Sequence, residues 1–262
     1  MVLSTLRSNN QLLASLSDTE WSCWQPWLEL VELPAGKLLF EAGRQIEYVH
    51  FPLTALVALY HVTESGASAE LALVGHEGLV GVSSFMGGGG AISHAVVLCA
   101  GQALRLPASA MLGRFAQSSQ VQRLMLSYTQ ALIAQMSQTA VCNRHHTIEQ
   151  ALSRWLLLSL DRVPGQELRM TQETIANMLG VRREGVTEAA LKLQAAGLIR
   201  YARGRITLLD RQGLEGRTCE CYHCIKAKYG HLLPEPVPLR SPHAAATRLS
   251  PLLRPCPENA VG

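Results

Sequence analysis

The sequence predicts an α+β fold in which a domain of short strands precedes a long helix and a compact helical domain. Short alternating or β-branched runs, separated by Gly and Pro, fill the chain from Val31 to Pro107, which is typical of a β-barrel or sandwich. From Ala108 onward, apolar residues recur at helical spacing. After His231 the chain holds seven of its twelve prolines, which favours a disordered tail.

Five segments follow from these patterns. They are N-terminal helices over residues 1–30, a β domain over 31–118, a long helix over 119–145, a helical domain over 146–230 and a Pro-rich tail over 231–262. The first segment is expected to be helical because Leu12, Leu16, Trp21 and Trp24 recur at intervals close to a helical turn.

The composition favours a protein that acts on nucleic acid. Residues 1–118 carry 5 basic and 9 acidic side chains, whereas residues 119–230 carry 15 basic and 9 acidic ones. An acidic front and a basic back suggest a sensor joined to a nucleic-acid binder. There is no signal-peptide pattern and no apolar run long enough to span a membrane. We therefore expect a cytoplasmic protein with no membrane partner.

The long helix carries a heptad-like stripe of large side chains. At spacings of four, three, four and four residues, the stripe comprises Val121, Met125, Tyr128, Leu132 and Met136. Such a stripe predicts a dimerisation helix and hence a homodimer. A helix packed against its own domain would carry the same pattern, and this alternative stays open.

Residues Met170 to Ala196 have the pattern of two helices joined by a tight turn. Thr171 can cap the first helix, and Gly180 stands where the turn requires a positive φ. Apolar residues are expected to face inward from both helices, namely Ile175, Met178, Leu179, Val186, Ala190, Leu191 and Leu193. This arrangement predicts a helix-turn-helix, whose second helix enters the major groove of DNA.

The outward face of the second helix is polar and comprises Arg182, Arg183, Glu184, Thr187 and Glu188. Arg can bind guanine through two hydrogen bonds, and Glu can accept one from cytosine. A surface helix with solvated charges is the alternative, and the surrounding Gly-turn and apolar pattern argues against it. We also place Thr171 and Gln172, at the start of the first helix, in the interface with double-stranded DNA.

A β-hairpin is predicted after the second helix. Strands on either side of Arg203-Gly204-Arg205 would form a wing with arginine at its tip. Arg200, Arg203 and Arg205 would meet phosphates, which supplies affinity more than sequence specificity.

These residues resemble the Crp/Fnr family of bacterial transcriptional regulators. The resemblance rests on Thr171-Gln172-Glu173, Leu179-Gly180-Val181-Arg182-Arg183-Glu184, Ala196-Gly197-Leu198-Ile199, Val31-Glu32-Leu33-Pro34-Ala35-Gly36 and Glu41-Ala42-Gly43. It implies a cyclic-nucleotide-binding-like jelly roll (a double-stranded β-helix), a homodimer on a palindromic operator, and RNA polymerase as a further partner. Arg183 and Glu184 match the family's base-reading pair, whereas Glu188 stands where many relatives have Arg.

The resemblance also implies an effector pocket in the β-roll, and this chain departs from the family there. Cyclic-nucleotide binders use an Arg to hold the phosphate, yet no Arg occurs between Arg44 and Arg105. We therefore expect a small-molecule effector other than cyclic AMP, or none, and its identity stays unknown. The residues at the corresponding positions are Glu77, Gly78, Leu79, Ser93 and His94.

A cysteine cluster follows the hairpin, with Cys219, Cys221 and Cys224 in six residues. Thiolates suit zinc or iron–sulfur chemistry, and His223 or Cys142 would be the fourth ligand. Reduced thiols on a helix are the alternative, so a redox- or metal-responsive regulator remains a second hypothesis. His145 and His146 are interpreted as capping or hinge residues.

A third hypothesis belongs to another class of protein, a β-barrel enzyme or ligand-binding protein with an inert winged-helix appendage. An inert appendage would not need the basic recognition surface around Arg183. The sequence has no phosphate-binding loop, no nucleophile elbow and no His-Glu-x-x-His zinc motif. We therefore expect no enzymatic activity and no catalytic residues.

Overall fold

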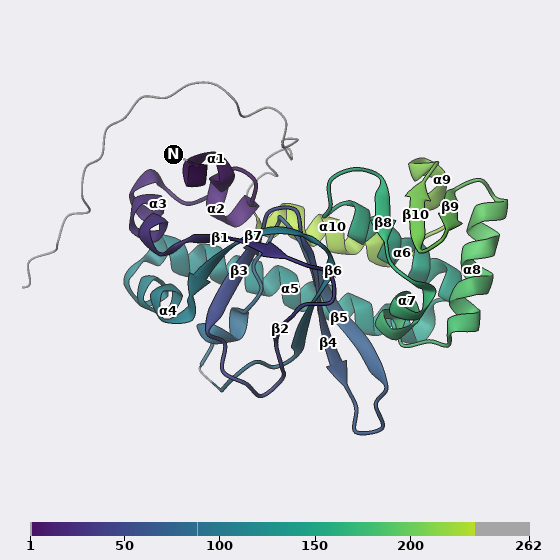
Figure 1. Cartoon of the computed structure of the whole chain (residues 1–262), viewed down its shortest axis with the longest axis horizontal. Coiled ribbons are helices and arrows are strands. Elements are labelled where there is room, and N and C mark those ends of the chain that lie inside the picture. The colour runs from purple at the N-terminus through teal and green to yellow at the C-terminus, as the bar shows by residue number, and fades with distance from the viewer. Residues whose placement is uncertain (1, 88, 234–262) are drawn as a thin grey trace, which may run out of the picture.

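The structure is a computed structural model, which describes residues 2–87 and 89–233. Figure 1 shows the N-terminal helices and the β domain on one side, the small helical domain on the other, and the long helix α5 running beneath both. The α+β class predicted from the sequence is confirmed. In the described residues, no helix is both long enough and apolar enough to cross a membrane.

The N-terminal segment is not one continuous helical stretch. It forms α1 (Val2–Arg7), α2 (Gln11–Ala14), α3 (Asp18–Trp24) and the 3-10 helix η1 (Gln25–Trp27). Asn10 caps α2 by accepting from the backbone of Leu12 and Leu13, and Ser17 caps α3 by accepting from Glu20. These side chains compete with a continuing helix for backbone donors, so the chain turns at each of them.

Two antiparallel sheets form the β domain, with strand orders β1-β7-β3 and β2-β6-β4-β5. The strands are β1 (Glu29–Leu33), β2 (Leu38–Phe40), β3 (Tyr48–Pro52), β4 (Leu56–Val62), β5 (Ser68–Val74), β6 (His94–Cys99) and β7 (Gly101–Pro107), with the 3-10 helix η2 (Val82–Ser84) between β5 and β6. The first four residues of β4 are all buried, because other elements cover both faces of the sheet there.

Two helices follow β7, where one helical pattern was expected from Ala108 onward. They are α4 (Ala108–Gln117) and α5 (Ser119–His145). The break falls at Ser118, which has an extended backbone and whose hydroxyl accepts from the backbone of Val121. The 27-residue helix α5 then contacts β5, α4 and α10 (Glu220–Leu232).

The helical domain begins at α6 (Ile148–Leu160). A capping box formed by Thr147 and Gln150 lies at the N-terminus of this helix. It continues through β8 (Glu167–Arg169), α7 (Gln172–Leu179), α8 (Arg183–Ala195), β9 (Ile199–Ala202), β10 (Arg205–Leu208) and α9 (Arg211–Glu215). The sheet order is β8-β10-β9, and β8 was not predicted because three residues carry too little periodicity.

The last described helix, α10, returns from the helical domain and packs along α5. It ends at Leu232, one residue past the expected start of the tail at residue 231. Residues 234–262, which hold the rest of the expected Pro-rich tail, lie outside the described residues.

Candidate nucleic-acid interface

The turn between α7 and α8 has the geometry that the sequence predicts. The hydroxyl of Thr171 accepts from the backbone of Thr174 at 3.1 Å and so caps α7. Gly180 has φ 65° and ψ 33°, a left-handed conformation that costs Gly little and other residues more. Ile175 and Val186 are fully buried between the two helices. The sequence therefore fixes how α8 emerges from the domain.

The first turns of α8 present charged side chains to solvent. Arg182 occupies the N-cap position, and Arg183, Glu184 and Glu188 are exposed on the helix that follows. Two exposed arginines therefore stand at the end of α8 that would enter a major groove first.

Glu188 forms an exposed ion pair with Lys192 one turn later, at 2.8 Å from Oε1 to Nζ. The hydrogen bond from Lys192 lowers the pKa of the Glu188 carboxyl. Glu188 is therefore ionised at neutral pH and already has a cationic neighbour, which distinguishes it from Glu184.

Thr187 lies differently from the other residues of the expected recognition face. It is half-buried, and its hydroxyl lies 2.8 Å from Oε1 of Gln172 and 3.0 Å from the carbonyl oxygen of Arg183. This contact joins the start of α7 to the first turn of α8. Thr187 and Gln172 thus hold the two helices together in addition to lining the surface.

The hairpin of β9 and β10 is a wing with a two-residue turn. Ala202 pairs with Arg205, and the intervening Arg203 and Gly204 have φ values of 50° and 72°. Positive φ at both positions is the type I′ turn, whose twist matches that of the strands. Arg203 is exposed at the tip.

The two remaining arginines of the wing are also exposed, Arg200 on β9 and Arg205 on β10. Nε of Arg205 lies 3.4 Å from Oε1 of Glu167 on β8. One of the three predicted phosphate-contacting arginines therefore shares its charge with a carboxylate of its own chain.

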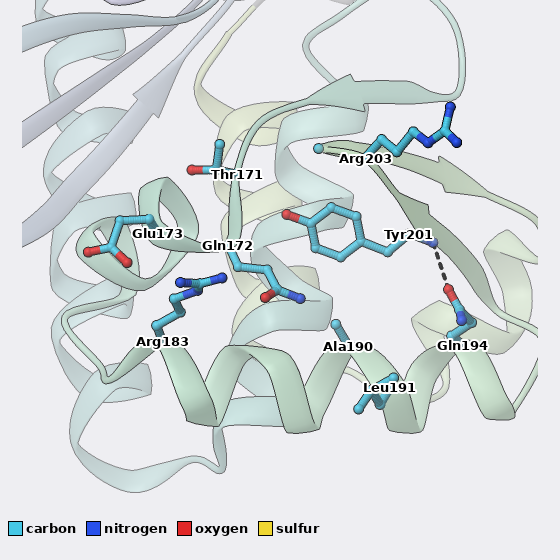
Figure 2. Close-up of a pocket in the computed structure, with 10 residues that line it drawn as sticks. Thr171, Gln172, Glu173, Arg183, Ala190, Leu191, Gln194, Tyr201 and Arg203 are labelled. Atoms are coloured by element: carbon cyan, nitrogen blue, oxygen red, sulfur yellow. Dashed lines mark hydrogen bonds between the residues drawn. The ribbon is translucent and has the colours of Figure 1, made fainter.

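A groove of about 530 Å³ separates α8 from the wing. Figure 2 shows Arg183, Gln172 and Tyr201 around it, with Ala190, Leu191 and Gln194 along α8. The backbone N–H of Tyr201 donates to Oε1 of Gln194 at 2.8 Å, and its hydroxyl donates to the carbonyl of Met170 at 3.0 Å. The first contact ties the wing to α8, and the second ties it to the segment before α7.

Sequence reasoning missed Gln194 and Tyr201 and placed Leu191 in the core. In the structure Leu191 is 59% exposed and lines the groove. A helical pattern cannot distinguish a core leucine from one at the edge of the apolar stripe. Tyr201 lies seven positions after its partner Gln194, and it was missed because no charge or motif marks it as an interface residue.

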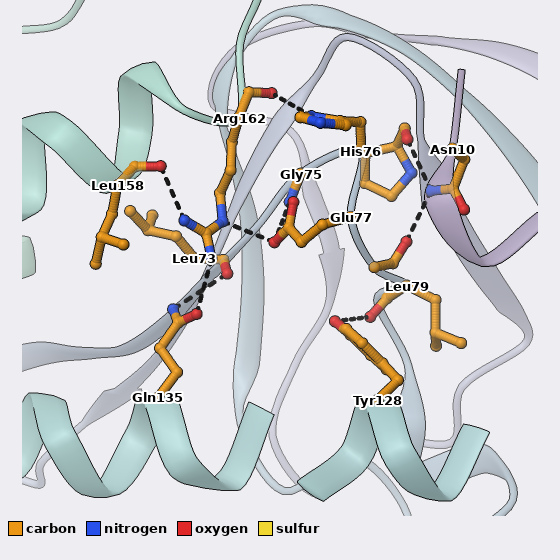
Figure 3. Close-up of polar contacts among 12 residues, drawn as sticks. Asn10, Leu73, Gly75, His76, Glu77, Leu79, Tyr128, Gln135, Leu158 and Arg162 are labelled. Atoms are coloured by element: carbon orange, nitrogen blue, oxygen red, sulfur yellow. Dashed lines mark hydrogen bonds and ion pairs between the residues drawn. The ribbon is translucent and has the colours of Figure 1, made fainter. Parts of the chain in front are cut away.

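The loop after β5, where an effector pocket was expected, is occupied by the protein's own side chains. Oε1 of Glu77 accepts from Nε of Arg162 at 2.7 Å, and both residues are buried. The same guanidinium donates to the carbonyl of Leu158 at 2.9 Å and to Oε1 of Gln135 at 3.0 Å (Figure 3). The carboxylate of Glu77 therefore forms an ion pair inside the protein with Arg162.

The other four residues expected in that pocket lie in two segments, the Glu77 loop and the start of β6. A Cβ on Gly78 would lie 2.4 Å from the ring of Tyr128, and Leu79 is fully buried. His94 on β6 pairs with Tyr60 on β4. Val74, at the end of β5 and beside the Glu77 loop, pairs with Val57, three residues earlier on β4. Ser93 precedes His94 and is buried. Strand register thus places these two segments three residues apart along β4, and their part in an effector pocket stays a prediction.

Two family models match the chain. A cyclic nucleotide-binding domain matches residues 30–118, and a Crp-like helix-turn-helix domain matches residues 150–217. Together they cover more than half of the sequence. The chain belongs to the Crp/Fnr family of transcriptional regulators. No curated protein matches it.

Solved structures agree with this fold. A Crp/Fnr-family regulator from Eubacterium rectale is 18% identical, with a TM-score of 0.63, over 82% of this chain and 99% of that one. FixK2 from Bradyrhizobium japonicum is 18% identical, with a TM-score of 0.62, over 73% and 98%. A CRP/FNR-family regulator from Thermus thermophilus is 23% identical, with a TM-score of 0.58, over 74% and 98%.

The long helix of this Crp/Fnr-family regulator turns its large apolar stripe inward. Val121, Met125, Tyr128 and Leu132 are at most 1% exposed, and Met136 is half-buried. The hydroxyl of Tyr128 donates to the carbonyl of Leu79 at 2.8 Å. These residues pack against their own protomer, so the expectation that they form the dimer seam is corrected in favour of the alternative left open above.

The cysteines that lie together in space are not the three that are close together in the sequence. Cys219 and Cys221 are buried beside Cys142, whereas Cys224 is exposed. His146, interpreted above as a capping or hinge residue, lies with the three buried thiols. Cys224 is therefore dropped from the candidate metal ligands, since α10 turns it away from the others.

Proposed function

We propose that this transcriptional regulator binds a palindromic DNA site as a homodimer, with the first turns of α8 in the major groove and the wing on the phosphate backbone. The observation that carries the proposal is the exposed Arg183 at the start of α8, bordered by the groove that separates α8 from the wing arginine Arg203. Arg at the start of a recognition helix can read guanine through two hydrogen bonds.

The remaining interface residues take supporting roles in this proposal. Arg182 and Glu184 flank Arg183 and contact neighbouring bases or phosphates. Glu188 is paired with Lys192, so reading a base would require it to leave that partner. Thr171 and Gln172 lie at the N-terminus of α7, where backbone N–H groups favour phosphate. Arg200, Arg203 and Arg205 supply salt-dependent affinity.

A second stripe on α5 supports a homodimer. Seven exposed positions of this helix recur at spacings of three and four, and they are Arg123, Leu126, Gln130, Ile133, Ser137, Ala140 and Arg144. Leu126 and Ile133 are 53% and 52% exposed, although large apolar side chains on a heptad stripe usually face a partner. We propose that a second copy of α5 covers this stripe, referred to below as the outer α5 stripe.

The effector is proposed not to be cyclic AMP bound in the family's manner. That manner would use Glu77 for the ligand, whereas the carboxylate here accepts from Arg162 at 2.7 Å in a buried ion pair. Breaking such a pair is costly because the remaining charge would be left buried. We further propose that the protein acts in the cytoplasm, with RNA polymerase as its partner in transcription.

Substitution at Arg183 tests the base-reading role. The operator would first be obtained by sequencing genomic DNA bound to the purified regulator. Arg183→Ala should then weaken binding to the operator by about 5- to 150-fold, the equivalent of losing about 1–3 kcal/mol from one bidentate contact. Binding to unrelated DNA should fall far less.

Arg203→Ala is the matched control at the wing. It should weaken binding to operator and unrelated DNA alike and reduce the salt dependence of both by about one phosphate contact. Equal losses on both DNAs for Arg183→Ala would reassign Arg183 to a phosphate contact. A failure of either variant to affect any DNA would refute the proposed surface.

A further inference from the structure

Three cysteines and one histidine from distant parts of the sequence meet at the C-terminal end of α5. Cys142 lies in the last turn of α5 and His146 ends it, while Cys219 caps α10 and Cys221 lies in its first turn. Their four donor atoms all lie within 4.8 Å of one another. We propose that they form a Cys3His site for a thiophilic divalent cation, with zinc as the ion.

Two of the distances between donor atoms match a tetrahedral site. Sγ of Cys142 lies 3.6 Å from Sγ of Cys219, and Sγ of Cys221 lies 3.4 Å from Nδ1 of His146. Zinc–sulfur bonds of about 2.3 Å and zinc–nitrogen bonds of about 2.0 Å place tetrahedral donors roughly 3.5–3.8 Å apart. These cysteines are free thiols in the structure, since the sulfur atoms of a disulfide are about 2.05 Å apart. Only small side-chain shifts are needed to admit the ion.

Neighbouring polar groups orient two of the donors. Oε1 of Glu220 lies 3.3 Å from Nε2 of His146, so Nε2 can carry the proton and leave the Nδ1 lone pair for the metal. A carboxylate behind a ligating imidazole is the usual support of a metal site. The side-chain amide of Gln138 donates to Sγ of Cys221 at 3.1 Å, which suits a thiolate.

The environment favours a structural ion over an open catalytic one. Cys142, Cys219 and Cys221 are buried, and His146 is half-buried. Four protein ligands leave no open position, which is typical of structural zinc sites. Cys219 stands at the N-terminus of the 13-residue helix α10, where the helix dipole stabilises a thiolate.

The place of the site indicates what the ion would do. His146 immediately precedes Thr147, whose capping box starts α6, so the cluster lies at the junction between α5 and the helical domain. Cys219 and Cys221 belong to the start of α10, the helix that returns along α5. A bound ion would therefore fasten α10 to this junction. The site does not depend on the proposed DNA contacts, and its test needs no DNA.

Metal content and cobalt spectroscopy of the full-length chain, purified with a thiol reductant, test the proposal. Elemental analysis should find one zinc ion per chain. Replacement by Co²⁺ should produce the strong visible bands of tetrahedral cobalt and a near-ultraviolet thiolate-to-cobalt band. Zinc added to the metal-free chain should raise the Tm by a few degrees or more, because a ligand that binds only the folded state stabilises it.

Cys221→Ser should abolish stoichiometric zinc and weaken both cobalt features. Cys224→Ser is the matched control, since this thiol lies on the same helix but is exposed and outside the cluster, and it should bind zinc as the unaltered chain does. His146→Ala keeps all three thiols and alters a half-buried position, so it tests the site even if a cysteine variant fails to fold. Circular dichroism would verify the fold of each variant.

Three results would overturn the proposal. The first is a folded, reduced chain that binds neither zinc nor cobalt stoichiometrically. The second is unchanged zinc content in folded Cys221→Ser or His146→Ala, or an equal loss in Cys224→Ser. The third is a Cys142–Cys219 disulfide found by mass spectrometry in chain purified separately without reductant, which would assign the cluster to thiol oxidation instead.

Discussion

Nε of Arg162, two residues beyond the end of α6, lies 2.7 Å from Oε1 of Glu77 in the loop after β5. The pair is buried, and the ring of Tyr229 on α10 lies 5.4 Å from the guanidinium carbon. Three parts of the regulator therefore meet at one charge: the β domain, the start of the helical domain and the last helix. The ion pair therefore joins the β domain to the helical domain.

Arg162→Met should lower the free energy of unfolding by about 3–5 kcal/mol, because it leaves the Glu77 carboxylate buried without its cation. Urea denaturation followed by circular dichroism measures this loss. The double variant Arg162→Met/Glu77→Gln should lose less than the sum of the two single variants, since no unpaired charge remains.

Lys192→Met serves as the control, because it breaks an ion pair of similar length between exposed side chains. Exposed pairs contribute little to stability, so its urea midpoint should stay close to that of the unaltered chain. If the double variant lost as much free energy of unfolding as the two single variants together, the proposed coupling between Arg162 and Glu77 would be contradicted.

We expect the free energy of unfolding to depend on pH through the buried carboxyl of Glu70. Burial raises its pKa to about 7, and its Oε2 accepts from Nε1 of Trp155 at 2.7 Å. The folded state thus holds a proton that the unfolded state releases at its ordinary pKa of 4.5. The resulting stabilisation, on the order of 3 kcal/mol, is complete below pH 4.5 and is lost as the pH rises through about 7.

Glu70→Gln should remove this pH-dependent stabilisation, while the amide oxygen of Gln still accepts from the Trp155 indole. The free energy of unfolding of the variant, measured between pH 4.5 and 8, should decline less with rising pH than that of the unaltered chain. Glu64→Gln, on the exposed turn between β4 and β5, should leave the pH dependence as it is. Identical slopes for Glu70→Gln and the unaltered chain would refute the assignment.

The outer α5 stripe predicts where the dimer can be broken. Ile133→Asp should yield monomers, because it places a charge in the centre of a stripe that the second copy would desolvate. Sedimentation equilibrium or light scattering measures the molar mass. The variant should keep its fold, since the side chain is 52% exposed in one protomer.

Leu209→Asp is the matched control, at a leucine that is 55% exposed but lies beyond β10. It should leave the oligomeric state unchanged. If Ile133→Asp remained dimeric, the interface would lie elsewhere. Tyr128→Asp would not test the interface, because the buried Tyr128 belongs to the core of one protomer.

Much of the DNA-binding surface could be predicted from the sequence because its signals are local. The cap at Thr171, the turn at Gly180 and the type I′ turn at Arg203-Gly204 each depend on a few consecutive residues. The arginines of α8 and the wing are exposed for the same reason: their neighbours in sequence already define the elements that carry them.

Local sequence patterns predicted the order of the main elements and the charged face of α8, since backbone preferences and periodicity act over a few residues. Tertiary packing was needed to show which of two interleaved stripes on α5 is buried and which stays exposed, because the β domain covers the more apolar one. It also decided that Glu77 meets Arg162 and that Cys142 and His146 meet Cys219 and Cys221. Such pairings join residues more than seventy positions apart, and packing rather than any local pattern brings them together.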